Sequence, residues 1–405
     1  MKQKICVIGL GYIGLPTAAL LASQGHEVVG VDINQHAVDT INSGRIHIVE
    51  PDLDAYVHSA VAQGRLRAYT APQSADVFMI CVPTPFHEDG DIPRPNVEYV
   101  QAATRSIAAY IKPGNLVILE STSPVGTTQM VADELARAGV DVGAVHIAYC
   151  PERVLPGKIM TELVENDRVV GGLAPEASKV VGAFYRGFVR GEVLETDAAS
   201  AEMCKLTENS FRDVNIAFAN ELSLICDKAG IDVWKLIALA NRHPRVNILQ
   251  PGAGVGGHCI AVDPWFIVAR DPENARLIRT AREVNNHKMH WVIDRIKAAA
   301  ADWMMTHNTK PRIACLGLAF KPDIDDLRES PALEISMTLH KQGYDVVAVE
   351  PNIEQHETLE LVSLDSGLEK ASLAVILVKH RQFVDPAVKH LLRQKTTLDF
   401  CGVGL

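Results

Sequence analysis

The chain has 405 residues, of which 47% are hydrophobic and 22% are charged, and its formal net charge is −10. This length predicts two or three domains, and the composition is that of a globular protein without low-complexity or repeat segments. The acidic balance and the lack of a basic tract argue against a nucleic-acid partner, although a local basic pocket for a small anion stays possible.

The eight cysteines are scattered, and none of them forms a CxxC pair. A zinc site, a redox dithiol and a disulfide framework are therefore not expected, and we predict no bound metal and a reducing, cytoplasmic setting. No stretch reaches the apolar length of a membrane span without Gly, Pro or charge, so no membrane partner is predicted. The first 22 residues resemble a signal peptide in charge and hydropathy, but their ordered glycines favour a strand, a glycine turn and a helix.

Strand and helix patterns alternate over residues 1–195, which predicts an N-terminal domain with a parallel, doubly wound sheet. The elements expected there are a strand at 4–9, a helix at about 14–24, a strand at 27–32, and apolar strands ending at Val82, Glu120 and Tyr149.

The sequence GLGYIG follows the first predicted strand and opens the first helix. Its first glycine permits a tight turn, its second lets the backbone approach a pyrophosphate, and its third lets helix and strand pack closely. An acid at the end of the second strand, Asp32, would accept hydrogen bonds from ribose hydroxyls and repel a 2′-phosphate, so NAD is predicted rather than NADP. The predicted dinucleotide site comprises Gly9, Gly11, Tyr12, Ile13, Gly14 and Asp32.

Two further strand ends carry hydroxyl-bearing loops, at Thr84 and at Thr122. Ligands of doubly wound sheets bind beyond the carboxyl ends of the strands, so both threonines are candidates to line the cofactor crevice. The alternative is that their hydroxyls only cap the loops.

Residues 196–307 are predicted to form a central helical domain. A helix from about Ala201 to Ala229 exceeds the usual length and suggests a spine between domains that also offers a dimer surface. The pattern breaks near residue 308, and residues 308–405 repeat the strand–helix–strand logic without GxGxxG. The predicted fold class is therefore α/β, with two Rossmann-like doubly wound domains joined by a long-helix central domain.

The central segment places Cys259 directly behind a glycine-rich run, with Asp263 four residues further on. A thiol held in a backbone loop near a carboxylate suggests a covalent nucleophile. A dinucleotide site combined with such a thiol allows an alcohol to be oxidised past the aldehyde, through a thioester, to a carboxylate.

Three other polar positions are candidates for the chemistry. Lys205 and Asn209 are four residues apart on the long helix and share a face, where they could stabilise an oxyanion or remain a solvated pair. Glu208 and Arg212 fit an ordinary surface ion pair. Glu152 follows a strand and could activate water, unless Arg153 pairs with it structurally.

Seven segments resemble the UDP-glucose/GDP-mannose dehydrogenase family in the family's order: GLGYIGLP, CVPTP, ESTSPVGTT, AYCPERVLPGK, EMCKLTENSFRD, PGAGVGGHC and GLAFKPDIDDLRESP. The match covers almost the whole chain. Within the family, the central segments are most similar to the members that oxidise UDP-N-acetyl-D-mannosamine. The resemblance implies four-electron, NAD-dependent oxidation of a UDP-sugar at C6, for surface polysaccharides such as enterobacterial common antigen, by a homodimer.

The resemblance also implies catalytic roles. Cys259 would attack the C6 aldehyde, and Lys205 and Asn209 would stabilise the oxyanions. Asp263 would assist proton transfer. Glu152 would handle the water that hydrolyses the thioester.

Further roles concern the two ligands. Thr122 would hold that water or the nicotinamide region, and Arg328 would reach the cofactor. Lys321 resembles a substrate-contacting lysine of the C-terminal domain, which would hold the uridine diphosphate. The substrate residues implied are Glu152, Arg153, Val154, Lys205, Asn209, Arg212, Arg242, Arg245, Gly252, Gly256 and Lys321.

One position departs from the family. Some members carry a second glutamate four residues after the PE glutamate, and Pro156 stands there in this chain. The alternatives to UDP-N-acetyl-D-mannosamine are UDP-N-acetylglucosamine and UDP-glucose. Two rival functions stay open: a two-electron hydroxyacid dehydrogenase, which does not need Cys259, and an NAD-binding scaffold without activity.

Overall fold

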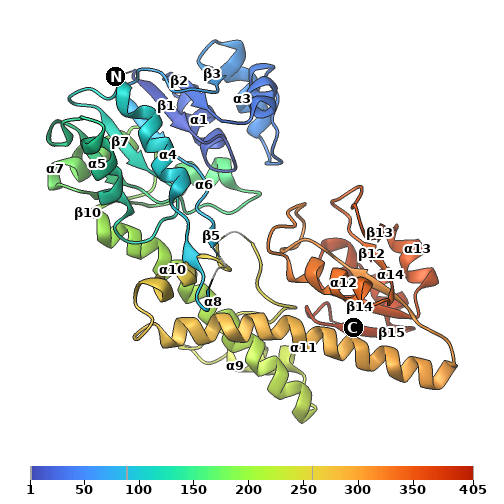
Figure 1. The fold of residues 1–405 in the computed structure, drawn as a ribbon. Helices are drawn as coiled ribbons and strands as arrows, with labels where there is room; N and C mark the ends of the chain where they lie inside the picture. The colour runs from blue at the N-terminus through green and yellow to red at the C-terminus, as the bar shows by residue number, and fades with distance from the viewer. Residues whose placement is uncertain (1, 88–89, 258, 405) are drawn as a thin grey trace. The chain divides into compact units, whose positions relative to one another are not determined.

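The computed structural model describes residues 2–87, 90–257 and 259–404. The chain divides into two compact units, Met1–Glu208 with Trp265–Arg270, and Asn209–Pro264 with Asp271–Leu405 (Figure 1). The division falls within two helices, α8 (Ala198–Ala229) and α10 (Asp263–Arg270).

The first unit contains a sheet of eight strands in the order β10-β9-β8-β7-β4-β1-β2-β3. All neighbouring strands are parallel except β8 and β9. The strands are β1 (Lys4–Ile8), β2 (Glu27–Val31), β3 (Leu66–Tyr69), β4 (Val77–Ile80), β7 (Leu116–Leu119), β8 (His146–Tyr149), β9 (Arg168–Gly172) and β10 (Val193–Asp197), and a separate hairpin consists of β5 (Phe86–His87) and β6 (Arg94–Pro95).

Both faces of this sheet are covered, which explains why its central strands β4 and β7 are apolar throughout. Along β1, Ile5 and Val7 belong to one buried cluster, and Cys6 and Ile8 belong to another. The helices of this unit are α1 (Gly14–Ser23), α2 (Gln35–Asn42), α3 (Leu53–Ala62), α4 (Glu98–Ile107), α5 (Thr127–Arg137), α6 (Ile159–Glu165), α7 (Pro175–Tyr185) and the part of α10 (Asp263–Arg270) that begins at Trp265, with short 3-10 turns η1 (Ala108–Tyr110) and η2 (Val142–Ala144).

The second unit contains the longer part of α8, then α9 (Val233–Ala240) and α11 (Arg276–His307). Helix α11 ends at its C-cap residue, Asn308, which is in the left-handed conformation. A buried polar network joins α8 to α11. Arg282 pairs with Asp213 at 2.7 Å, and Lys288 donates to the Ser223 hydroxyl at 2.6 Å.

The remaining chain forms a five-stranded parallel sheet in the order β13-β12-β11-β14-β15. This order repeats that of β3-β2-β1-β4-β7 in the first sheet. Its elements are β11 (Arg312–Leu316), α12 (Pro331–Lys341), β12 (Asp345–Val349), β13 (Glu360–Leu361), α13 (Leu364–Lys370), β14 (Leu373–Ile376), η3 (Arg381–Val384), α14 (Pro386–Arg393) and β15 (Thr396–Asp399).

The first turns of the two sheets are built alike. Gly9 follows β1 with φ +90° and donates its N–H to Val31, and Gly317 follows β11 with φ +93° and donates its N–H to Val349. Two doubly wound α/β parts and a long-helix connection are thus present, as the sequence predicts. Among the described residues, no helix combines the length and apolar character needed to cross a membrane.

Candidate active site

The glycine turn after β1 has the geometry that a dinucleotide needs. A Cβ at Gly14 would overlap the Gly9 carbonyl oxygen, which explains why helix α1 can lie so close to the strand. A Cβ at Gly11 would meet nothing within 4 Å, so the space beside this residue is open. Tyr12 packs against the apolar cluster of the sheet, and Ile13 is the N-cap residue of α1.

The N-terminus of α1 and the end of β2 complete this site. No side chain caps α1, although the N–H of Leu15 in its first turn donates to the Gly11 carbonyl oxygen at 3.1 Å. The positive end of the helix dipole favours a phosphate group at this terminus. Asp32 accepts hydrogen bonds from the N–H groups of Leu10 at 3.0 Å and Asn34 at 2.9 Å, which fixes its carboxylate beside the glycine turn. Carboxylate oxygens have further lone pairs for ribose hydroxyls. The residues present therefore fit NAD.

The two hydroxyl-bearing loops are tied together. The Thr84 hydroxyl donates to the Thr122 carbonyl oxygen at 2.5 Å, and Ser121 donates to the Val82 carbonyl oxygen at 2.7 Å. The predicted pair is thus adjacent at the carboxyl ends of β4 and β7. The alternative that these hydroxyls cap the loops holds for Thr84, because its hydroxyl bonds to the backbone of the neighbouring loop.

Glu152 lies in the loop after β8, and its side chain is buried. One oxygen accepts the N–H of Arg153 at 2.7 Å, and the other pairs with Arg168 of β9 at 2.5 Å. The guanidinium of Arg153 pairs with Glu208 at 2.6 Å instead. The predicted Glu208–Arg212 surface pair is therefore wrong, because Arg153 reaches Glu208 from a loop that is distant in sequence.

Lys205 is positioned by the first turns of α8. One turn earlier, Glu202 accepts the N–H groups of Gly126 and Thr128, both at 2.7 Å, and so joins α8 to the start of α5. Burial raises the pKa of Glu202, while hydrogen bonds from Thr128 and Gly126 oppose this. Lys205 is only 8% exposed. A buried cation is suited to an anionic ligand or a developing oxyanion.

The second unit brings Asn209 and Asp263 together. The Asn209 amide donates to the Asp263 carboxylate at 2.5 Å, and both side chains are buried. Asp263 in turn donates its N–H to the carbonyl oxygen of Cys259 at 2.8 Å, at the start of α10. Cys259 itself is exposed, so its thiol is accessible to a ligand.

The glycine run before Cys259 is packed against the C-terminal part of the chain. A Cβ at Gly256 would overlap the carbonyl oxygen of Glu329, and Gly257, with φ +86°, donates its N–H to the Arg328 carbonyl oxygen at 3.2 Å. Gly252 donates its N–H to the Asn220 side chain at 3.0 Å. The backbone of this run is thus held from both sides.

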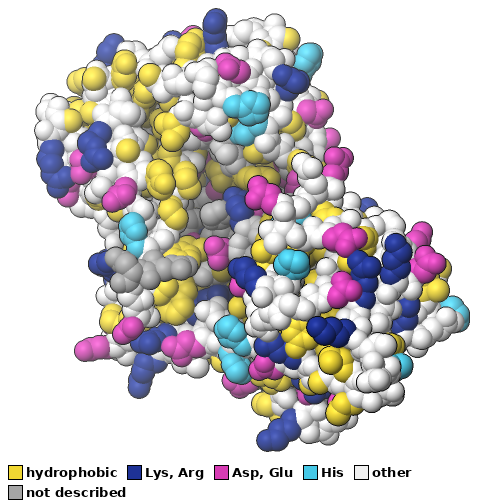
Figure 2. All heavy atoms as spheres, turned by 45° about the vertical axis from the view of Figure 1, so that its right-hand side comes forward, with side chains coloured by type: hydrophobic (Ala, Val, Ile, Leu, Met, Phe, Trp, Pro, Cys, Tyr) yellow, Lys and Arg dark blue, Asp and Glu magenta, His cyan; other side chains and the backbone are white. Residues whose placement is uncertain are grey.

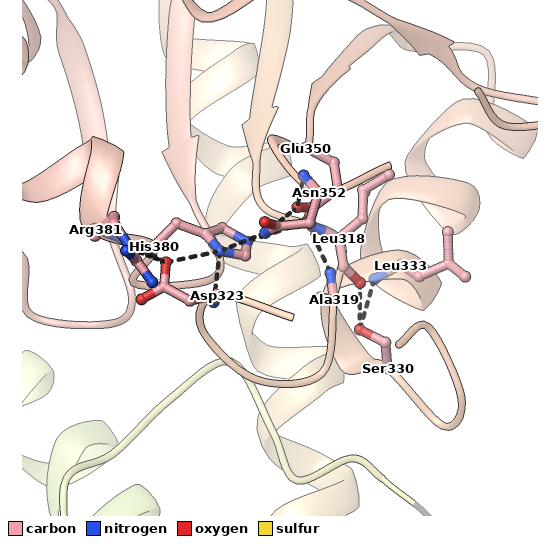
Figure 3. Close-up of polar contacts among 9 residues, drawn as sticks. All are labelled: Leu318, Ala319, Asp323, Ser330, Leu333, Glu350, Asn352, His380 and Arg381. Atoms are coloured by element: carbon pink, nitrogen blue, oxygen red, sulfur yellow. Dashed lines mark hydrogen bonds and ion pairs between the residues drawn. The ribbon is translucent and has the colours of Figure 1, made fainter. Parts of the chain in front are cut away.

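The loop after β11 carries Lys321 and Arg328, and a buried carboxylate holds its base (Figure 3). Glu350, at the end of β12, accepts the N–H groups of Leu318 at 2.8 Å and Ala319 at 3.0 Å and contacts His380 at 3.1 Å. Burial alone would raise the pKa of Glu350, but these hydrogen bonds outweigh it and lower the pKa. Glu350 therefore keeps its charge and orients the loop.

The same loop is strained and internally paired. Asp323 and Glu329 are non-glycine residues with φ of 62° and 49°, and such conformations persist where the surroundings enforce them. Asp323 accepts the N–H of Arg381 at 3.0 Å, and Arg328 pairs with Asp326 at 2.5 Å. Lys321 is half-buried.

The other predicted substrate residues lie nearer the surface. Val154 is half-buried, and Arg212, Arg242 and Arg245 are exposed. Basic and acidic side chains intermingle over the face shown in Figure 2.

Several residues around these sites escape sequence reasoning. Arg168 is the first residue of the apolar strand β9, RVVGG, and its side chain is buried in an ion pair with Glu152. A single charged residue in an apolar strand is the one sequence feature that could have indicated such a buried pair. Glu50 accepts the N–H groups of Gly157 and Ile159, both at 2.8 Å, and thereby fixes the loop of Glu152 from more than a hundred residues away. No local pattern marks such a contact.

Three family models match the chain. They are the NAD binding domain, the central domain and the UDP binding domain of the UDP-glucose/GDP-mannose dehydrogenase family, over residues 3–189, 199–287 and 314–403. The last of these supports a UDP-sugar as substrate.

The chain is also similar to characterised relatives over most of its length. It is 59% identical over 397 residues to the UDP-N-acetyl-D-mannosamine dehydrogenase of Escherichia coli, with 94% of each chain covered. It is 58% identical over 395 residues to the NDP-N-acetyl-D-galactosaminuronic acid dehydrogenase of Ralstonia nicotianae, covering 94% of this chain and 92% of the relative. The structure of the UDP-D-ManNAc dehydrogenase from Pyrococcus horikoshii matches with a TM-score of 0.89 and 38% identity, covering 99% of this chain and 96% of that one. The glycine turn that fits NAD and these matches agree, and the chain belongs to the UDP-glucose/GDP-mannose dehydrogenase family as an NAD-dependent nucleotide-sugar dehydrogenase.

Proposed function

We propose that this enzyme oxidises the C6 hydroxyl of UDP-N-acetyl-D-mannosamine to a carboxylate, with NAD accepting a hydride in each of two steps. The observation that carries the proposal is the exposed Cys259 beside the buried Asn209–Asp263 pair. The name of the E. coli relative supports the choice of substrate.

In this reaction the Cys259 thiolate adds to the C6 aldehyde and forms a thiohemiacetal. The thiohemiacetal is a competent hydride donor, and loss of its hydride to NAD gives a thioester. A free thiol has a pKa of about 8.5, so the cation of Lys205 and the N–H groups of the glycine run would favour the reactive thiolate. Lys205 and Asn209 stabilise the oxygen anions, and Asp263 takes part in proton transfer. Glu152 activates the water that releases the carboxylate.

A second substrate is also supported. The Ralstonia relative, whose name refers to N-acetyl-D-galactosaminuronic acid, is almost as similar as the E. coli one. An enzyme for an N-acetylgalactosamine-type nucleotide sugar would use the same chemistry and differ in how the pocket reads the sugar hydroxyls.

The substrate is tested by measuring NADH formation with the UDP derivatives of N-acetylmannosamine, N-acetylglucosamine, N-acetylgalactosamine and glucose. We expect two NADH per sugar and the highest kcat/KM with the mannosamine derivative. The highest kcat/KM with the galactosamine derivative would assign the second substrate. One NADH per sugar would favour the two-electron rival, and no NADH with any of the four would favour the scaffold.

We further propose that the enzyme is a homodimer. Phe211, Phe218 and Ile225 are spaced seven residues apart on α8, so they share one face, and their exposed fractions are 68%, 51% and 55%. Large apolar side chains in a row on one helix are costly to leave in water, and a second copy presenting the same row can cover them.

The apolar stripe formed by Phe211, Phe218 and Ile225 can be tested by substitution. Phe218→Asp places a charge in its centre, so we expect a monomer in light scattering at concentrations where the wild type is dimeric. Leu391→Asp, on α14, changes an exposed apolar residue outside the stripe and should leave the dimer intact. A dimeric Phe218→Asp variant would contradict this interface.

The biological setting follows from the proposed product. We propose that the domains correspond to residues 1–195, 196–307 and 308–405, which bind NAD, carry the cysteine loop and dimer surface, and bind the UDP-sugar. The scattered cysteines support a cytoplasmic reaction without a metal, and the net charge of −10 argues against a nucleic-acid partner. A uronic acid product suits surface polysaccharide synthesis.

A further inference from the structure

A second buried carboxylate lies close to Glu152 in the first unit. Glu120 follows β7 directly, and its side chain is only 2% exposed. The Tyr185 hydroxyl donates to one of its oxygens at 2.6 Å, and the Cys81 thiol donates to the other at 3.3 Å. Cys81 follows β4, so this cluster lies at the strand ends that also carry Thr84 and Thr122.

A chain of contacts joins Glu120 to Glu152. Arg168 pairs with Glu152 at 2.5 Å and donates its other terminal nitrogen to the Leu163 carbonyl oxygen at 3.0 Å. Its guanidinium carbon lies 5.5 Å from the centre of the Tyr185 ring. Tyr185 thus contacts both Arg168 and Glu120, while Arg168 forms its ion pair with Glu152.

The charges in this cluster do not balance if both carboxylates are ionised. Burial and the charge of Glu152 raise the pKa of Glu120 to about 7, while Arg168 and the hydrogen bonds from Tyr185 and Cys81 oppose the increase. Burial also raises the pKa of Tyr185 and of Cys81 far above their usual values, and that of Cys150 to about 12, so these three stay neutral. Glu120 is the member of the cluster that can exchange a proton at neutral pH.

We propose that Glu120 is a positioning residue that sets the pH range in which Glu152 activates water. Protonated Glu120 adds no charge beside the Glu152–Arg168 pair. Ionised Glu120 adds a second negative charge to the cluster, which favours transfer of a proton from the attacking water to Glu152. This inference rests on the role of Glu152 in the proposed function.

The sign of the pH dependence follows from the protonation of Glu120. As the pH rises through about 7, Glu120 loses its proton, and the rate of thioester hydrolysis rises. Proton transfer rates change with the strength of the base, so an increase of about 3- to 10-fold is expected. The two hydride transfers precede the step of Glu152 and should not follow this titration.

The test follows NADH formation and the decay of the acyl adduct on Cys259 in single turnovers between pH 5.5 and 8.5. We expect the wild type to show an inflection near pH 7 in adduct decay alone. Glu120→Gln keeps an acceptor for Tyr185 but cannot ionise, so the inflection should disappear. Tyr185→Phe removes a hydrogen bond that stabilises ionised Glu120, so the inflection should move to higher pH.

Cys150→Ala changes the packing of the same cluster without changing its charge and should retain the inflection. An unchanged inflection in Glu120→Gln would overturn the inference, and so would an unshifted inflection in Tyr185→Phe if Glu120→Gln fails to fold. A wild type that forms no acyl adduct contradicts the proposed function, and the inference with it. An adduct that forms while the inflection survives in Glu120→Gln contradicts the inference alone.

Discussion

Cys259→Ser is expected to abolish formation of the carboxylate, with a loss on the order of 10⁴-fold or more in kcat for the complete reaction. A serine hydroxyl is almost entirely protonated at neutral pH and is a poor nucleophile without a dedicated base. No thiohemiacetal forms, so the second hydride has no donor. Steady-state assays should find no more than one NADH per sugar.

Cys204→Ser is the matched control for this variant. Cys204 is half-buried on α8, and its thiol donates to Glu208 at 3.7 Å, which a serine hydroxyl can also do. This control should retain two NADH per sugar at a rate near that of the wild type. Full carboxylate production by Cys259→Ser would contradict the covalent mechanism, because it would show that the second oxidation does not need the thiol.

Glu152→Gln is expected to stop the reaction after both hydride transfers. The amide cannot accept a proton from water, and the loss of a general base lowers the rate by about 10²- to 10⁴-fold. Rapid mixing should give a burst of two NADH per active site and then a slow phase. The burst distinguishes a failure of hydrolysis from a failure of oxidation.

The structural cost of this variant needs a control. Glu152→Gln leaves Arg168 facing a neutral partner, so some loss of thermal stability is expected in addition to the kinetic effect. Glu162→Gln changes a nearby carboxylate, which accepts the N–H of Leu155 in the same loop. This control should turn over without a burst, because it leaves the base unchanged. A Glu152→Gln variant with wild-type turnover would show that another group activates the water.

Much of the fold could be predicted because its signals are local. The turn at Gly9 requires a positive φ, and the start of helix α1 at Gly14 has no room for a Cβ. Both requirements favour glycine, and they explain the glycines of GLGYIG. Asp32 ends an apolar strand where an acid has no reason to be unless it faces a ligand or a loop. Local patterns do not locate strands β9 and β10, because β9 begins with the buried Arg168 and β10 is half exposed.

The candidate site was predictable only in part. Cys259 and Asp263 are separated by one helical turn, so their proximity follows from spacing. Asn209 meets Asp263 across 54 residues, and Glu120 meets Tyr185 across 65, so only the fold brings these pairs together. The incorrect Glu208–Arg212 pair has the same origin: helix spacing permitted it, but a distant loop supplied a better partner.

The most direct test of the covalent mechanism is intact-protein mass spectrometry of Glu152→Gln after reaction with the UDP-sugar and NAD. We expect a mass increase equal to that of the acyl sugar nucleotide. Peptide mapping should locate this adduct at Cys259, and hydroxylamine should remove it. A Glu152→Gln enzyme that releases two NADH per active site without ever carrying an adduct at that cysteine would contradict this mechanism.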